Sequence, residues 1–184
     1  MNKSMYFLII LSFLIIGCKK EADPFLVSKH SIGLLTDSTQ IKDLDLIFPN
    51  DSVVKPIEDN GFSSNENEIE IFEKGGKKLL VLELNKTQDS TAVISSVQIM
   101  DPRYKTDKNI TNLSAFKDIN DNYKISKISN LINSIVVFVD EINASFTIDK
   151  KELPSDLRFD MTLTIEKIQI PDKAKIKYFF VYWN

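Results

Sequence analysis

The sequence predicts an α+β domain with a mainly antiparallel β-sheet and two short helices. From Phe25 onward the chain divides into short segments in which apolar and polar residues alternate, as in strands with one solvent-exposed face. Two other segments, 37–49 and 114–123, instead carry apolar residues at helical spacing. A length of 184 residues fits one compact domain.

Strands are predicted where Val, Ile, Thr and aromatic residues concentrate. The segments are 68–71, 78–84, 91–100, 134–139, 144–148, 161–170 and 174–183. Gly75 and Gly76 separate the first two, and this predicts a hairpin because both glycines tolerate positive φ. Within 161–170 the alternation slips near Glu166 and Lys167, which predicts a bulge or a strand break.

The two predicted helices share a capped start and one apolar face. In the first, the apolar positions are Ile41, Leu44 and Ile47 or Phe48, and Pro49 ends the helix. In the second they are Phe116, Ile119 and Tyr123. The segment TQIKDLDLIF at 39–48 aligns without a gap with SAFKDINDNY at 114–123, an offset of 75. This alignment predicts two related helix-then-strands units, although short capped helices also resemble one another by chance.

The N-terminus has the organisation of an export signal. A short positive stretch, Met1 to Ser4, precedes the apolar run MYFLIILSFLII at 5–16, and Gly17 and Cys18 follow. This run is too short to cross a bilayer as a helix, which requires about 20 residues. It matches the hydrophobic region of a secretory signal.

The sequence Ile15-Ile16-Gly17-Cys18 resembles the lipobox of bacterial lipoproteins, with Ile15 where that family prefers Leu. The resemblance implies cleavage before Cys18 and acylation of its sulfur and of its new amino group. Residues 1–17 would then be the signal peptide, 18–24 a lipidated tether and 25–184 the globular domain. The alternative is an uncleaved signal anchor followed by a chance cysteine.

We therefore expect an exported protein whose partner is a lipid membrane, held through acylated Cys18 in the outer membrane. The sequence leaves open whether the domain faces the periplasm or the cell surface. Cys18 is the single cysteine, so no intrachain disulfide can form. Without residues 1–17, which contain only Lys3 among the charged residues, 22 basic and 26 acidic residues remain, a net charge of −4. This acidity argues against a nucleic-acid partner.

Residues for catalysis, metal binding or cofactor binding are few. His30 is the single histidine and is expected to be an ordinary surface residue. The sequence has no G-x-S-x-G motif, no glycine-rich phosphate loop and no Cys or His pair for zinc, so neither a cofactor nor a metal is predicted. These observations favour a non-catalytic domain that binds an envelope protein or glycan, or has a structural role. The alternative is an envelope hydrolase that uses a pair of carboxylates.

Two further sets of residues are candidate sites. Asp-Ser-(Thr/Val) occurs at Ser38, Ser52 and Ser90 and resembles an O-glycosylation motif of some Gram-negative lineages, although turn formation also favours Asp-Ser. At the C-terminus, KIKYFFVYWN is apolar on both faces of a strand, as in a central strand. Alternatively, the face of Phe179 and Trp183 is a binding patch, because Trp is frequent at interfaces.

Overall fold

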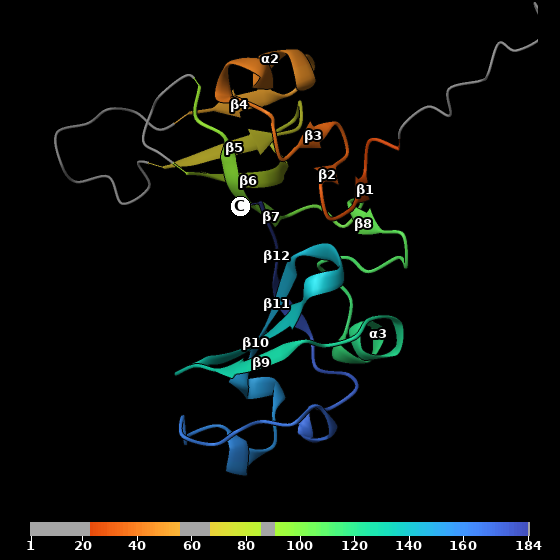
Figure 1. Cartoon of the computed structure of the whole chain (residues 1–184), viewed down its shortest axis with the longest axis vertical. Coiled ribbons are helices and arrows are strands. Elements are labelled where there is room, and N and C mark those ends of the chain that lie inside the picture. The colour runs from red at the N-terminus through yellow and green to blue at the C-terminus, as the bar shows by residue number, and fades with distance from the viewer. Residues whose placement is uncertain (1–22, 56–66, 86–90, 184) are drawn as a thin grey trace, which may run out of the picture.

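The computed structural model describes residues 23–55, 67–85 and 91–183, which form an α+β fold with two β-sheets (Figure 1). The strands of the described part are numbered β1 to β12, and every pairing except that of β1 with β8 is antiparallel. The predicted fold class is therefore confirmed. Within the described ranges, no helix is both long enough and apolar enough to cross a membrane.

Eight strands form the larger sheet, in the order β4-β5-β6-β7-β12-β11-β10-β9. Their bounds are β4 (Ser52–Val54), β5 (Glu68–Phe72), β6 (Lys78–Leu84), β7 (Ile94–Ile99), β9 (Lys127–Asn130), β10 (Ser134–Val139), β11 (Ala144–Asp149) and β12 (Ile176–Tyr182). The central pair is β7 and β12, where Val97 lies opposite Val181. The sheet thus consists of two four-stranded halves that meet at this pair, one in the upper and one in the lower part of Figure 1.

A helix precedes each half of this sheet. The 3₁₀-helix η1 (Ile41–Asp43) continues into α2 (Leu44–Ile47) ahead of β4, and α3 (Phe116–Asn122) lies ahead of β9. The chain therefore runs twice through the same series, a helix followed by four antiparallel strands. The two series enter the sheet from opposite edges and end side by side at β7 and β12 (Figure 1).

Equivalent backbone contacts hold both helices. Gln40 forms a bridge with Val93 just before β7, and Ala115 forms one with Lys175 just before β12. Ile41 N then donates to Ala92 O at 3.2 Å, and Phe116 N donates to Ala174 O at 2.8 Å. Gln40 and Ala115 are 75 residues apart, as are Ile41 and Phe116, which is the offset of the sequence alignment. The helix-then-strands repeat is therefore present in the fold, and its origin by duplication stays a prediction.

The core lies between the helices and one face of the large sheet. Leu44, Phe116 and Ile119 are at most 1% exposed and point from the helices into this core. On the sheet, Phe146 of β11 stacks on Phe179 of β12 with ring centroids 4.6 Å apart. Burial of an apolar side chain of this size contributes about 1.5–3 kcal/mol to the free energy of folding. The opposite face of the sheet remains partly exposed.

A smaller sheet packs beside the first half. Its strands are β1 (Leu26–Val27), β2 (Ser31–Ile32), β3 (Leu35–Thr36) and β8 (Lys105–Thr106), in the order β3-β2-β1-β8. Gly33 has φ +57°, and a Cβ at this position would lie 2.1 Å from Pro24 O. The first described residues therefore lie directly on the β2–β3 turn.

The hairpin predicted at Gly75 and Gly76 is confirmed. It joins β5 to β6, and Glu73 N donates to Lys77 O at 2.8 Å across the turn. The φ angles of the two glycines are +119° and +91°, which L side chains rarely adopt.

The strand predicted at 161–170 is wrong. These residues belong to the connection between β11 and β12, which contains the 3₁₀-helices η3 (Lys150–Glu152), η4 (Ser155–Leu157) and η5 (Lys167–Gln169). Asp160 Oδ1 accepts hydrogen bonds from the backbone and the hydroxyl of Thr162, and Glu166 N donates to Gln169 Oε1. These local side-chain bonds take the place of a sheet ladder.

Candidate functional sites

Several predicted site residues are accessible or lie outside the described ranges. Cys18 and Ser90 lie outside these ranges. Ser38 and Ser52 are both exposed. Ser38 Oγ is 3.1 Å from Thr36 Oγ1, and Thr39 N donates to Thr36 O in the same tight turn. The turn explanation thus applies at Ser38, and glycosylation of these serines stays a prediction.

The binding patch predicted at Phe179 and Trp183 is wrong, because both side chains belong to the core. Phe179 is 0% exposed and Trp183 is 4% exposed. The β12 strand lies in the centre of the large sheet, between β7 and β11, and both side chains belong to its buried hydrophobic core. The central-strand alternative therefore holds for this face.

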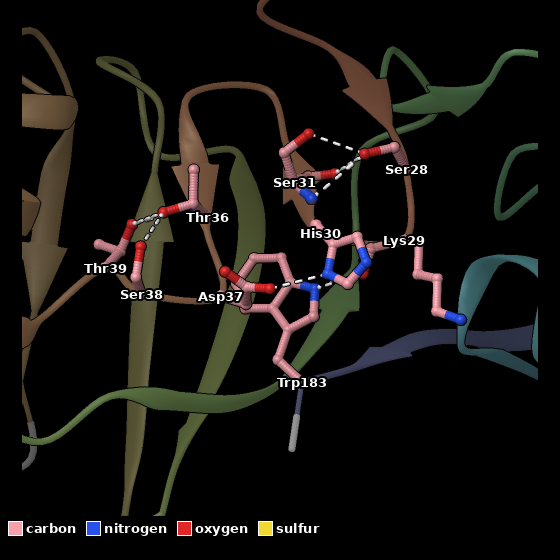
Figure 2. Close-up of polar contacts among 9 residues, drawn as sticks. All are labelled: Ser28, Lys29, His30, Ser31, Thr36, Asp37, Ser38, Thr39 and Trp183. Carbon is pink, nitrogen blue, oxygen red and sulfur yellow. Dashed lines mark hydrogen bonds and ion pairs between the residues drawn. The ribbon is translucent and has the colours of Figure 1, made fainter.

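Trp183 ties the end of β12 to the smaller sheet, as Figure 2 shows. Its indole Nε1 donates to Lys29 O at 3.1 Å, in the turn between β1 and β2. This contact joins residues 154 positions apart in the sequence. It has the character of a structural bond, since the indole ring fills the core while its N–H satisfies a backbone carbonyl.

His30 lies beside this contact and pairs with an acid at the surface. Its Nδ1 is 2.8 Å from Asp37 Oδ2, and its side chain is 71% exposed (Figure 2). The nearby Ser28 and Ser31 hydroxyls are 2.7 Å apart and pair with each other. Among the contacts of the described residues, none joins a hydroxyl to the His30 ring. The pair of His30 and Asp37 joins the two ends of the β2–β3 hairpin. An exposed ion pair of this kind contributes about 0–1 kcal/mol to the free energy of unfolding.

A second cluster surrounds Asp101, which is 0% exposed. Its carboxylate accepts hydrogen bonds from the Arg103 backbone and guanidinium, and Lys77 Nζ lies 2.8 Å from its Oδ2. Burial raises the pKa of Asp101, but the hydrogen bonds from Arg103 and Lys77 more than offset this effect and hold the pKa well below its usual range. The acid stays ionised and holds the β5–β6 turn against the chain that follows β7.

The face of β12 opposite to Phe179 carries a row of aromatic rings. Tyr178, Phe180 and Tyr182 follow one another along the strand, with ring centroids 6.3 Å apart in each step. Tyr178 is 41% exposed, and the other two are half-buried. We call this row the aromatic face. It lies on the side of β12 opposite to Phe179 and Trp183, the residues of the alternative binding patch.

Polar groups surround the aromatic face. The Tyr182 hydroxyl lies 2.9 Å from Ser145 Oγ on β11, and Phe180 lies between Ser145 and Gln98 in the register of the sheet. Lys177 Nζ lies 5.4 Å from the centroid of the Tyr178 ring. Aromatic rings beside hydroxyl and amide groups can contact a ligand both by stacking and by hydrogen bonds.

Three acids of the described part have a pKa that is clearly shifted from its ordinary value. They are Asp101, Asp149 and Asp160, and the pKa is lowered at each. At Asp149 the largest cause is the hydrogen bond from the Lys151 backbone, and at Asp160 it is that from the Thr162 hydroxyl. A general acid of a glycosidase requires a raised pKa instead. Among all residues that the structure describes, no group of three or more His, Cys, Asp or Glu side chains could hold a metal ion.

Comparisons with known proteins show the fold and do not assign a function. No family model matches the chain, and no curated protein matches it. Among solved structures, the crystal structure of the uncharacterized protein yfeY from Escherichia coli is similar, with a TM-score of 0.52. The match covers 85% of this chain and 98% of that chain at 13% sequence identity. At this identity the similarity shows a common fold alone.

Proposed function

We propose that this chain is an exported lipoprotein, anchored in the outer membrane through acylated Cys18, whose domain binds an envelope component rather than catalysing a reaction. The lipobox-like sequence before Cys18 supports the anchor. Several acyl chains on one residue would give stable attachment, because a single chain binds membranes only reversibly. The tether at 18–24 is short, so the domain would lie close to the membrane.

The observation that carries the binding role is the aromatic face. Tyr178, Phe180 and Tyr182 form a row of neighbouring rings on the partly exposed side of a central strand. Tyr and Trp dominate the energetics of many interfaces because their large rings lose little conformational entropy on binding. The envelope component would therefore be a protein or a glycan that lies across β12.

The hydrolase alternative receives less support. It requires one carboxyl group with a raised pKa near a second, ionised carboxylate. The three pKa shifts resolved among the described acids are all downward, the direction typical of acids that form structural hydrogen bonds. We therefore base the proposal on binding.

The aromatic face predicts a specific loss of binding. We expect Tyr178→Ser combined with Phe180→Ser to lower capture of the full chain on purified peptidoglycan sacculi by about tenfold, since removal of a central aromatic contact typically removes more than 1 kcal/mol. If the partner is a protein, a photo-crosslinking amino acid at position 178 will give a discrete adduct in intact cells instead.

Leu113 provides the control, because it is 66% exposed and lies outside the aromatic face. Leu113→Ser should leave capture on sacculi unchanged, and the crosslinker at position 113 should give no adduct. Equal loss of capture in both variants, or adducts of the same size from both positions, would contradict a binding role for the aromatic face.

A further inference from the structure

The two repeated units differ most in the connection that precedes the last strand of each. Residues 150–175 join β11 to β12, whereas residues 85–93 join β6 to β7. The longer connection contains η3, η4 and η5 and forms the lower end of the molecule in Figure 1. Since the repeated fold does not require this additional chain, it is a place to search for a function of its own.

An open groove of about 750 Å³ lies between this connection and the sheet. Residues of the β9–β10 turn, the end of β11, the segment 158–161 and β12 line it. Small-molecule sites in proteins have volumes of about 300–1,000 Å³. The charged residues among those that line the groove are Asp149, Lys150, Lys151, Arg158 and Lys177. Four cations and one acid give the groove a positive charge, although the whole chain is acidic.

Lys150 is the central observation. It is 4% exposed, and its ammonium has no hydrogen-bond partner in the described part of the chain. The alternation of β11 explains its orientation, because Lys150 continues the buried positions Phe146 and Ile148. An ammonium removed from water is unfavourable unless an anion or a hydrogen-bond acceptor replaces the lost water.

Neither Asp149, which precedes Lys150 in the sequence, nor Asp160, which feels its charge, supplies that replacement through a hydrogen bond. The pKa of Asp160 is lowered mainly by hydrogen bonds from the side chain and backbone of Thr162, and the charge of Lys150 adds to this. Asp160 is itself exposed, and its Oδ1 accepts from Thr162. Asp149 accepts from the Lys151 backbone and pairs with Lys177 at 3.4 Å. An anion from outside the chain would complete the environment of Lys150.

Arg158 supplies a second, oriented cation. Its Nε donates to Leu153 O at 2.8 Å, so the backbone of the same connection fixes the guanidinium beside the groove. A guanidinium held by one edge can present its other N–H groups to a carboxylate or phosphate.

The rim of the groove is apolar and exposed. Phe159 is 88% exposed, Ile132 69% and Met161 53%, and all three line the groove. A simple inorganic anion would satisfy Lys150 and leave these side chains in water. An uncharged apolar ligand would cover them and leave the ammonium without a partner.

From this combination we propose that the groove binds one detached anionic amphiphile, an alkyl chain with a carboxylate or phosphate head group. Lys150 and Arg158 bind the head group, and Phe159, Met161 and Ile132 cover the alkyl chain. This inference goes beyond the proposed function and does not depend on the anchor at Cys18 or on the aromatic face.

The test is photolabelling of the full chain in neutral detergent with a dodecyl phosphate that carries a diazirine on its alkyl chain. Labelled peptides are mapped by mass spectrometry. We expect label on peptides that contain Phe159 or Met161. Excess dodecyl phosphate should displace the probe, whereas dodecyltrimethylammonium, with the same chain and a cationic head group, should not.

Lys150→Met keeps an unbranched side chain and removes the ammonium. We expect it to raise the concentration of dodecyl phosphate needed for half displacement by about tenfold or more, as for the loss of a charge-assisted contact. Lys42→Met, at an exposed position on η1, is the matched control and should leave this concentration unchanged. Thermal melting of both variants shows whether they are folded. We expect Lys150→Met to fold, because it removes a buried charge that lacks a hydrogen-bond partner in the described part of the chain.

Three results would overturn the proposal. The first is equal displacement by the cationic and anionic amphiphiles, and the second is unchanged displacement in folded Lys150→Met. The third is binding to phosphatidylglycerol vesicles without labelling by the monomeric probe, which would mean adsorption to a membrane surface. None of these results would bear on the anchor or on the aromatic face.

Discussion

Asp101 and Lys150 are buried charged residues with opposite surroundings. Asp101 is 0% exposed and receives hydrogen bonds from Arg103 and an ion pair from Lys77. Lys150 is 4% exposed, and its ammonium lacks a hydrogen-bond partner within the described ranges. Loss of one partner of a buried ion pair is strongly destabilising, and a buried charge without a partner is unfavourable until a ligand supplies one. The same degree of burial thus indicates a structural role for Asp101 and a binding role for Lys150.

The ion-paired environment of Asp101 predicts a loss of stability on substitution. Asp101→Asn should lower the free energy of unfolding at pH 7 by about 2–3 kcal/mol, because Arg103 and Lys77 lose their buried acceptor while remaining partly exposed. Asp156→Asn is the control, since Asp156 is exposed on η4. Urea unfolding followed by circular dichroism measures both differences.

The pH dependence of this difference follows from the direction of the pKa shift. Because the pKa of Asp101 is lower in the folded state, its contribution is complete above the unfolded pKa of about 3.9 and is lost as pH falls toward the folded pKa. The gap between wild type and Asp101→Asn should therefore stay constant from pH 7 to pH 5 and narrow below about pH 4. A gap that widens on acidification would contradict this explanation.

At the scale of elements, the turns are where sequence and structure agree most directly. Gly75 and Gly76 form the predicted hairpin, and the positive φ angles that glycine permits are present at both. The alternation in 144–148 also predicts β11 correctly. By contrast, 161–170 has a similar alternation but forms a loop and a short 3₁₀-helix, because side-chain bonds of Asp160 and Gln169 satisfy its backbone locally.

The candidate sites were harder to predict for a related reason. The period of β12 separates its two faces, but it does not tell which face the helices cover, so the sequence left both a central strand and a binding patch open for Phe179 and Trp183, and their burial decides for the central strand. The position of Lys150 in phase with Phe146 and Ile148 was a usable signal for burial. The absence of a partner for its ammonium depends on side chains far apart in the sequence, and only the folded chain shows it.

Substitution of Gly33 or Gly76 by Ala should lower the free energy of unfolding by different amounts. Gly76→Ala should destabilise by about 1–2 kcal/mol, because its Cβ meets no atom within 4 Å and only backbone strain opposes it. Gly33→Ala should destabilise more, because strain adds to the contact with Pro24 O. Urea unfolding of both variants measures the difference, and equal losses would show that Pro24 moves aside freely.

At the scale of the whole molecule, the two repeated units form one continuous sheet and share one core. The β7–β12 pair joins them, and Trp183 at the end of β12 then bonds the turn after β1. The connection with η3, η4 and η5, whose residues help to line the groove, forms the lower end of the molecule in Figure 1, whereas the described chain begins in the upper half beside β1.

The anchor is the central claim, and comparison of the full chain with Cys18→Ala tests it most directly. Cells that express each form are fractionated, the N-terminus of the purified protein is analysed by mass spectrometry, and intact cells are treated with protease. We expect the wild type to be in the membrane fraction with an acylated Cys18 at its N-terminus and Cys18→Ala to lack acylation and leave the membrane. Protease sensitivity in intact cells would indicate the outer surface. An unmodified Cys18, with the variant still membrane-bound, would contradict the proposal and identify residues 5–16 as an uncleaved anchor.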